Sequence, residues 1–334
     1  NPLIAGSLGE TDSDSDGFSD TYEGAPLTYN GTVTKNRTFA KTSYDLNDSD
    51  SDGILDGYEW ACGESQFFSY FTDFDTDDDG VSDGDEKNIR LAPTQIDTDY
   101  DGLRDGLELG VTVEKLQHPE STGCSGDCNN FMGGTIIEQF FPDHDTSTTT
   151  NPLLPDSDFD SFFLFEEELT KQRIWSNPYL YQFKKLVRKY SEDSEDFGVW
   201  LYDGDEDNNQ NGRWDDCETN PNNNDSDNDG IPDGWEVYYS NISSLSDICI
   251  NGSLPYNSNL TANPMISDSD KDSDNDGLSN YLEFILGTNP NLEDTDNDGL
   301  PDGIEDTNLN AAIEPDETDP RDPHHTRHHL TVRS

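Results

Sequence analysis

The sequence predicts a repeat array that has no large hydrophobic core, and two observations predict it. The first is composition: the 334-residue chain has 73 acidic and 18 basic residues, a formal net charge of −55, and only 30% hydrophobic residues. Such a composition is typical of disorder unless something other than apolar burial holds the chain together. The second is spacing: the acidic residues recur in register along the chain, which indicates a bound ligand.

The charge and hydropathy argue against a nucleic-acid partner and against a transmembrane segment. Phosphate would be repelled along nearly the whole length, so we expect no nucleic-acid partner. No apolar run approaches the roughly 20 residues that cross a bilayer, so we expect no transmembrane segment. The chain starts at Asn1 without an initiator Met or a signal peptide, so we expect a mature or excised product.

The repeat is the frame D-x-D-x-D-G-x-x-D-x-x-E, whose positions we number 1 to 12. Copies that match in full begin at residues 12, 48, 75, 97, 225 and 294. Two more, beginning at residues 207 and 272, carry Asn at some Asp positions. More than half of the acidic residues lie in these windows. Halophilic adaptation would spread acids over the surface, so it does not explain this placement.

This spacing suits Ca²⁺, a hard cation that takes roughly six to eight oxygen ligands. Positions 1, 3 and 5 would supply side-chain oxygens, position 7 its backbone carbonyl, position 9 a direct or water-mediated ligand, and position 12 both oxygens of Glu. Glycine at position 6 permits a backbone with φ > 0. Mg²⁺ prefers tighter octahedral sites, and transition metals are not expected in oxygen-only shells. Bound metal would turn the repulsion between these carboxylates into folding energy.

We therefore expect about eight or more Ca²⁺ ions and no other cofactor. In the first four frames the predicted ligands are Asp12, Asp14, Asp16, Phe18, Asp20, Glu23, Asp48, Asp50, Asp52, Ile54, Asp56, Glu59, Asp75, Asp77, Asp79, Val81, Asp83, Glu86, Asp97, Asp99, Asp101, Leu103, Asp105 and Glu108. In the other four they are Asp207, Asn209, Asn211, Arg213, Asp215, Glu218, Asp225, Asp227, Asp229, Ile231, Asp233, Glu236, Asp272, Asp274, Asp276, Leu278, Glu283, Asp294, Asp296, Asp298, Leu300, Asp302 and Glu305.

These loops resemble thrombospondin type 3 repeats of secreted and surface proteins, in their microbial form. Most lack the long flanking helices of EF-hands. Linkers such as Gly287-Thr288-Asn289-Pro290 and Thr219-Asn220-Pro221 are similar to the Gly-Thr-Asn-Pro linker that precedes the next loop in that family. The likeness covers roughly residues 10–110, 140–170 and 203–323. It implies a calcium-stapled repeat array of irregular loops and turns, with short helices and few short strands, in which each unit contacts mainly its neighbours.

Two further frames depart from the pattern. In the frame that begins at Asp156, Ser161 replaces the glycine and Leu164 occupies position 9, so we do not count it as a site. In the frame that begins at Asp306, Ala311 replaces the glycine, and the frame ends in Glu317-Thr318-Asp319-Pro320, as expected of a terminal repeat. The acids Asp203, Asp205 and Asp207 belong to overlapping frames, so neighbouring frames could share ions there.

The frames and the gaps between them divide the chain into successive regions. These are an N-terminal tail (1–11), calcium repeats (12–108), a Cys-containing insertion and linker (109–155), a degenerate repeat with a basic amphipathic helix (156–202), calcium repeats with a glycosylated loop insertion at 237–267 (203–320), and a basic C-terminal tail (321–334). Residues 135–141 are apolar enough for a strand. Residues 281–286 predict a helix that ends at Gly287.

The insertion after Ser161 is the basic one. Asn177-Pro178 is a good helix start, and apolar residues then recur at helical spacing up to Tyr190. A basic amphipathic helix can bind a membrane surface. On so acidic a chain, packing against its own acidic loops, or those of a neighbouring copy, is the favoured interpretation.

Five cysteines indicate an oxidising compartment. Cys124 and Cys128 are close enough to pair; their spacing also resembles a metal knuckle, but no other Cys or His cluster nearby completes one. Cys62, Cys217 and Cys249 remain, and the connectivity stays open.

Asn-x-Ser/Thr sequons are the other sign of an extracellular protein. Those clustered in inserted segments favour N-glycans at Asn30, Asn36, Asn241, Asn251 and Asn259. Two more, at Asn47 and Asn224, lie directly against calcium loops.

The two ends differ from the middle. Leu3 and Ile4 give a small apolar start, and residues 324–332 combine histidines with an alternating pattern that could add an edge strand. An exposed basic tail is favoured over a histidine metal site. Complementary ends would suit subunits that contact one another, so we expect self-association into a polymer or surface array.

Three classes of function are consistent with these observations. We favour an extracellular, calcium-stabilised structural protein, a subunit of a surface filament, surface layer or adhesive stalk. The alternative is a rigid calcium-binding spacer of a larger secreted enzyme or adhesin. A calcium sensor would need a Met-rich groove, and the chain has two Met. We expect no enzyme, because no H-E-x-x-H, G-x-S-x-G or P-loop motif is present.

Overall fold

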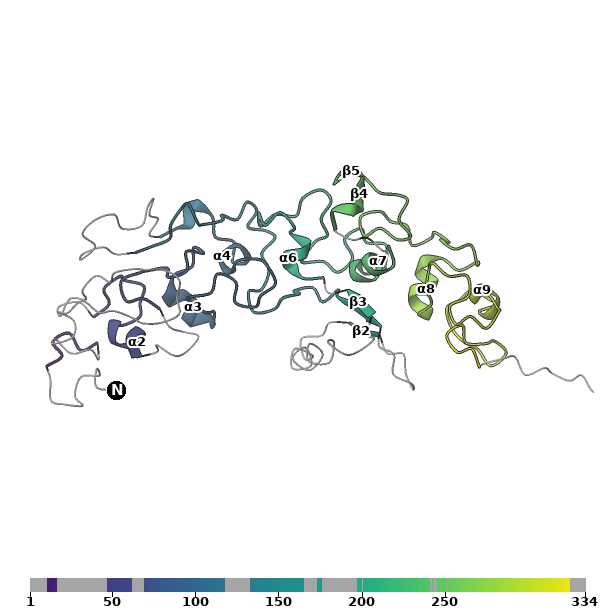
Figure 1. Ribbon diagram of the computed structural model, residues 1–334, viewed down its shortest axis with the longest axis horizontal. Coiled ribbons are helices and arrows are strands. Elements are labelled where there is room, and N and C mark those ends of the chain that lie inside the picture. Colours follow the sequence, from purple (N-terminus) through teal and green to yellow (C-terminus); the bar gives the residue numbers. More distant parts are fainter. Residues whose placement is uncertain are drawn as a thin grey trace, which may run out of the picture. The chain divides into compact units, whose positions relative to one another are not determined.

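The chain is composed mainly of loops and turns, with helices of one or two turns between them (Figure 1). The computed structural model describes residues 11–16, 47–61, 69–117, 133–164, 173–175, 197–199, 201–240, 242, 245–250 and 252–324. It divides into two compact units, residues 1–155 with 209–213 and residues 156–208 with 214–334. The predicted irregular repeat array is confirmed.

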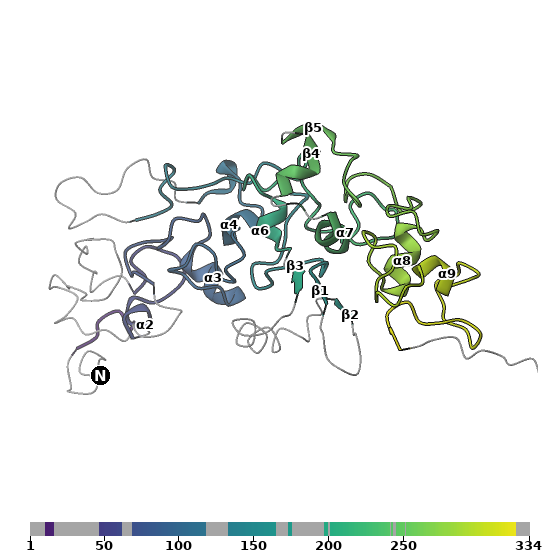
Figure 2. The ribbon, with the colours of Figure 1, turned by 45° about the vertical axis from the view of Figure 1, so that its right-hand side comes forward.

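Among the described residues of the first unit, each α-helix begins at position 9 of a frame. The helices are α2 (Asp56–Ala61), α3 (Asp83–Ile89) and α4 (Asp105–Glu108), followed by the 3₁₀ helix η1 (Val113–Lys115). The Asp at position 9 and the Glu at position 12 lie in the first turn, where negative charge complements the helix dipole. α3 and α4 lie side by side in both ribbon views (Figures 1 and 2).

The second unit contains the strands. β1 (Phe162–Leu164), β2 (Arg173–Trp175) and β3 (Phe197–Val199) form an antiparallel sheet in the order β2-β1-β3, with Phe162 opposite both Trp175 and Val199. β4 (Cys249–Ile250) pairs with β5 (Ser253–Tyr256). The helices are α6 (Asp203–Glu206), α7 (Asp233–Ser240), η3 (Leu245–Ile248), α8 (Asn280–Leu286) and α9 (Asp302–Glu305).

A small aromatic cluster forms the hydrophobic core of the second unit. Ile231, Trp235, Tyr239 and Ala262 are buried together, with Tyr238 and Phe284 packed against them. The Trp235 ring centroid lies 4.7 Å from that of Tyr239 and 5.9 Å from that of Phe284. In the same unit, a disulfide joins Cys217 to Cys249, the first residue of β4. This disulfide resolves part of the connectivity that the sequence left open.

The interior of both units is otherwise rich in acid. Fully buried carboxylates are unusual unless they are paired or bind a metal. Side chains with no exposed surface include Asp75, Asp79, Asp83, Glu86, Asp105, Asp160, Asp203, Glu206, Asp233, Glu236, Glu283 and Asp302.

Several predicted elements can be compared with the structure. The helix predicted over 281–286 is confirmed as α8, and Gly287 ends it with φ 89°. The strand predicted over 135–141 is wrong: residues 137–139 form a turn, because Thr135 and Ile136 bond instead to carboxylates of the frame at 75. The loop predicted over 237–267 is also wrong, because the apolar face of α7 continues to Tyr239 and β4 pairs with β5.

Other predictions fall outside the described residues. They concern the basic helix after Asn177, the tails up to residue 10 and from residue 325, and the cysteines Cys62, Cys124 and Cys128.

Candidate metal centres

Each loop is organised around the Asp at position 1. In the frame at 75, Asp75 Oδ1 accepts a hydrogen bond from the N–H of Asp78 (2.9 Å) and Oδ2 accepts one from Gly80 (2.9 Å). The frames at 48, 97 and 272 repeat both bonds. The position-5 Asp79 accepts from the position-7 N–H of Val81 through Oδ1 (2.8 Å). The backbone therefore fixes both oxygens of the position-1 carboxylate and one oxygen of the position-5 carboxylate, and the acids at positions 1, 3 and 5 gather within 4.8 Å of one another.

Two positions of the frame have a left-handed backbone. The glycines at position 6 have φ of 97° at Gly53 and 110° at Gly102, for example, as the sequence predicts. Position 4 is also left-handed in all ten frames, from Ser15 (φ 67°) to Leu309 (φ 55°), and the sequence analysis missed this. Asn at position 4 of three frames is the signal that could have found it, because Asn tolerates this conformation.

The Asp at position 9 holds its own loop closed. Asp83 accepts hydrogen bonds from the N–H (2.8 Å) and the Oγ1–H (2.6 Å) of Thr76, the position-2 residue. The same pair joins Ser49 to Asp56, Thr98 to Asp105, Ser226 to Asp233 and Thr295 to Asp302. The hydroxyl at position 2 also accepts a linker N–H, from Tyr70 to Thr76 (3.1 Å) and from Asn289 to Thr295 (2.9 Å). We call this arrangement the position-2/position-9 latch.

Consecutive frames meet through carboxylates. Oxygens of Asp79, Glu86 and Asp105 lie within 4.8 Å of one another, and so do those of Asp52, Glu59 and Asp83. Each group combines positions 5 and 12 of one frame with position 9 of the next. A second group, seen in the frames at 12, 48 and 75, contains positions 1, 3 and 5, as in Asp48, Asp50 and Asp52. The Asp at position 5 is therefore common to both groups.

Glycine at position 10 makes this contact possible. The N–H of Gly106 donates to Asp79 Oδ2 of the preceding frame (3.0 Å), and Gly303 donates in the same way to Asp276 (3.0 Å). A Cβ on Gly106 would lie 2.0 Å from the Asp79 carbonyl oxygen. The sequence analysis missed this glycine, although Asp-Gly at positions 9 and 10 recurs in the frames at 48, 75, 97, 225 and 294.

The position-12 carboxylates differ in their hydrogen bonding: Glu59 and Glu108 accept bonds from the hydroxyls of Ser69 (2.9 Å) and Thr150 (3.0 Å), respectively, whereas others accept none. Neither oxygen of Glu86 accepts a hydrogen bond, nor does either oxygen of Glu236. Burial, and then repulsion from Asp77 and Asp79, raise the pKa of Glu86 well above its usual value. Burial and the nearby acids raise the pKa of Glu283 to about 9.

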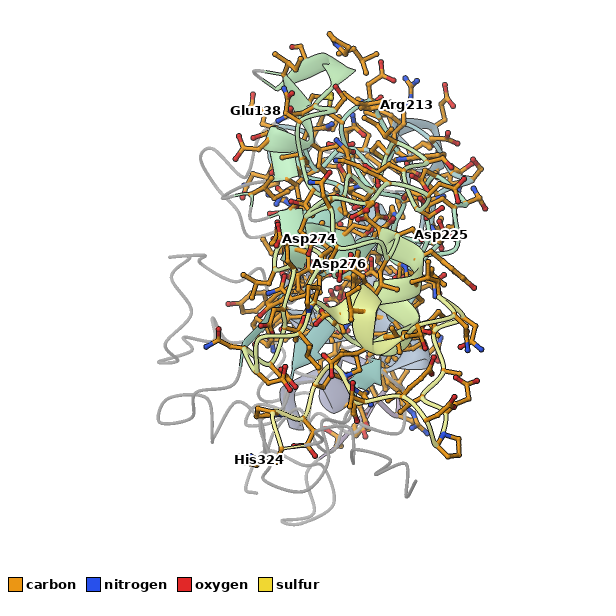
Figure 3. All side chains as sticks on the ribbon, turned by 90° about the vertical axis from the view of Figure 1, so that its right-hand side faces the viewer. Glu138, Arg213, Asp225, Asp274, Asp276 and His324 are labelled. Atoms are coloured by element: carbon orange, nitrogen blue, oxygen red, sulfur yellow. A yellow bond between two sulfur atoms is a disulfide. The ribbon has the colours of Figure 1, made fainter. Side chains whose placement is uncertain are left out.

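This donor set fits a hard divalent cation. Burying unpaired carboxylates is costly, and a cation at their centre would neutralise the charge and satisfy the free oxygens. Figure 3 shows Asp274 and Asp276, positions 3 and 5 of the frame at 272, next to each other. All of the side-chain donors in these groups are oxygens, which suits Ca²⁺ better than transition metals.

Three frames differ from this scheme. Only positions 1 to 5 of the frame at 12 are described, so Phe18, Asp20 and Glu23 lie outside the described residues. The frame at 207 is divided between the two units, since residues 209–213 belong to the first. In the frame at 306, Ala311 adopts φ 56° and donates to Asp306 as a glycine would, but the amides of Asn308 and Asn310 already donate to Glu314.

The frame at Asp156 corrects the sequence analysis. Leu164, which we expected at position 9, lies in β1. The N–H of Ser157 donates instead to Asp203 Oδ1 (2.7 Å), so a residue that follows the basic insertion takes the place of position 9.

Comparison with known proteins agrees with the repeat assignment. Residues 75–89, 225–239, 272–292 and 294–308 match the family described as the bacterial TSP3 repeat. The chain therefore contains repeats of this family, and the resemblance stated from the sequence is confirmed. Repeats of this family bind calcium and suggest a structural role, and the clustered carboxylates support calcium binding here. No curated protein and no solved structure matches the chain.

The helices of the described residues are all too short or too polar to span a membrane.

Proposed function

We propose that this protein is an extracellular, calcium-stabilised structural protein, a non-enzymatic subunit of a surface filament, surface layer or adhesive stalk. The observation that carries the proposal is the meeting of positions 5 and 12 of one frame with position 9 of the next, as in Asp79, Glu86 and Asp105. An ion held there would bind two repeats at once. A row of such ions would stiffen the chain without a large apolar core.

The proposed ligands are the predicted ones, with one refinement. Both oxygens of position 9 accept hydrogen bonds within their own frame, yet one of them lies within 4.8 Å of carboxylate oxygens of the preceding frame. We therefore assign Asp83 to the ion beside Asp52 and Glu59, and Asp105 to the ion beside Asp79 and Glu86.

An extracellular location is supported by two features. Cys217 and Cys249 form a disulfide, and such bonds persist in oxidising compartments. Asn259 of the Asn-Leu-Thr sequon is exposed, as a glycan acceptor must be. Glycans at Asn30, Asn36, Asn241 and Asn251 remain part of the proposal.

Metal analysis and electron microscopy test this function together. The purified full chain should retain about eight or more calcium ions, as its frames require. Negative-stain images with calcium should show filaments or sheets, and a chelator should disperse them. A chain that binds no calcium would refute the proposal. A chain that binds calcium but never assembles, and whose precursor carries a catalytic or lectin domain, would favour the alternative, a rigid spacer of a larger secreted enzyme or adhesin.

A further inference from the structure

The frame that begins at Asp156 is complete, but its two halves are separated by the basic insertion. Phe159 at position 4 has φ 66°, the same left-handed conformation as position 4 of the other frames. The chain leaves the frame after Ser161 and returns at Leu201. Leu201 is buried, like the position-7 residues Ile54 and Ile231 of continuous frames.

The second half of the frame follows directly. α6 begins at Asp203 and ends at Glu206, as α4 and α9 begin at position 9 and end at position 12. The bond from Ser157 N–H to Asp203 Oδ1 (2.7 Å) is the backbone part of the position-2/position-9 latch. Gly204 supplies the glycine of position 10. Residues 201–206 therefore act as positions 7 to 12.

Hydrogen bonds bring the ends of the insertion together. β1 and β3 are neighbours in Figure 2. They pair antiparallel, with Phe162 opposite Val199. Just inside them, the Ser161 hydroxyl donates to the Leu201 carbonyl (3.1 Å) and accepts from the Leu201 N–H (2.9 Å). In a continuous frame the position-7 N–H donates to the position-5 Asp, as Val81 does to Asp79. Here Ser161 takes that hydrogen bond and leaves Asp160 without it.

Two carboxylates are consequently buried without partners. Asp160 and Glu206 are both fully buried, and none of their four carboxylate oxygens accepts a hydrogen bond. Burial, and then the nearby Asp160 and Asp158, raise the pKa of Glu206 well above its usual value. Asp233, position 9 of the frame at 225, is near enough for its charge to raise the pKa of both Asp160 and Glu206. Glu206 therefore has the same kind of neighbours as Glu59, which lies between Asp52 and the position-9 Asp83.

We propose that Asp158, Asp160 and Glu206, together with Asp233, hold a divalent cation that clasps the base of the insertion spanning residues 162–200. The ion would fasten the inserted basic segment to the repeat array, because its ligands come from both sides of that segment. The proposal rests on the proposed function, in that the ion is taken to be the calcium of the continuous frames.

The test compares position-12 variants of the full chain, with metal content and hydrogen exchange as the measurements. Glu206→Gln removes the negative charge at position 12 of the frame that begins at Asp156. Glu86→Gln removes the equivalent charge in the continuous frame at 75. Glu138→Gln alters an exposed Glu outside the frames. In Glu206→Gln, calcium affinity at this site should fall by at least roughly 10–100-fold, the range found when a group supporting a metal ligand is lost. The backbone amides of β1 and β3 should then exchange faster.

Two control variants show whether the effect is specific to position 12 of the frame that begins at Asp156. Glu86→Gln should lose calcium but keep the exchange rates of β1 and β3, and Glu138→Gln should behave as the unaltered chain. If Glu206→Gln unfolds throughout, Glu206→Asp replaces it: β1 and β3 should then regain protection only at higher calcium concentration.

Two outcomes would overturn the clasp while leaving the proposed function intact. One is that Glu206→Gln binds as much calcium as the unaltered chain. The other is that β1 and β3 exchange at rates independent of calcium in the unaltered chain and in Glu206→Asp, as expected if Asp160 and Glu206 are simply protonated. If the unaltered chain binds no calcium at all, the proposed function itself fails.

Discussion

Two neighbouring pairs of frames show two ways of ordering this chain. The frames at 75 and 97 follow each other closely, and Asp79 Oδ2 accepts directly from Gly106 of the next frame. The frames at 225 and 272 are separated by an insertion, and Asp229 Oδ2 accepts instead from the N–H groups of Asp268 (2.9 Å) and Ser269 (2.7 Å) at the end of that insertion.

The difference lies in what supports the connection. In the first pair, the contact between frames is made by carboxylates and backbone, so its stability depends on the ions that neutralise the acids. In the second pair, the aromatic cluster around Trp235 and the Cys217–Cys249 disulfide order the inserted residues as well. Ions suffice for adjacent frames, and apolar packing is added where the chain makes a detour.

Removal of calcium should have the largest effect, and it should affect the two pairs of frames differently. With a chelator, the amides of residues 75–108 should lose their protection from hydrogen exchange, because unpaired buried carboxylates such as Glu86 would repel one another. Residues 231–262 should keep part of theirs, since the cluster and the disulfide do not require metal. Equal protection of both segments after chelation would contradict this distinction.

Truncating the aromatic cluster should have the next largest effect, and this effect should fall on residues 231–262 rather than on residues 75–108. Trp235→Ala should destabilise the region around α7 by about 3–5 kcal/mol, the usual cost of deleting a buried aromatic side chain. Urea denaturation with saturating calcium, followed by hydrogen exchange, would measure it. Residues 75–108 should be unaffected, and the more exposed Trp214→Ala serves as the control. A loss shared by both segments would argue against their independence.

The sequence was sufficient to predict the frame, the positive φ at its glycine and the helix at 281–286. It did not reveal the partners of each acid, because spacing along the chain does not say which frame a carboxylate serves. Asp83 lies in one frame but contacts the acids of another, and Asp203 completes a frame that begins at Asp156. A single insertion is enough to hide such a frame from a pattern of fixed length. The position-10 glycines could not be explained from the sequence, because the carbonyl oxygen that excludes a Cβ there belongs to the preceding frame, as Asp79 does for Gly106.

Gly106→Ala tests whether that glycine is required by the contact. A Cβ would clash with the Asp79 carbonyl oxygen at 2.0 Å, so we expect a loss of about 1–3 kcal/mol, typical of overpacking. Gly303→Ala meets the Asp276 carbonyl oxygen at 2.5 Å and should cost less. Local opening energies from hydrogen exchange in saturating calcium would measure both. If Gly106→Ala stabilised α4, as alanine does at an open helical position, the contact between the frames would not be as described.

Loss of the position-2/position-9 latch should have an effect no larger than that of Gly106→Ala. Thr76→Val keeps the shape of the side chain but removes the hydroxyl that donates to Asp83 and accepts from Tyr70, so it should cost about 1–3 kcal/mol for the buried groups left unpaired. Thr76→Ser retains the hydroxyl and reproduces the residue found at position 2 of the frames at 48 and 225, so its effect should be much smaller. Both variants can be compared by hydrogen exchange of α3 at saturating calcium. Equal behaviour of Val and Ser would mean that shape, rather than the hydroxyl, matters at position 2, and that calcium alone positions Asp83.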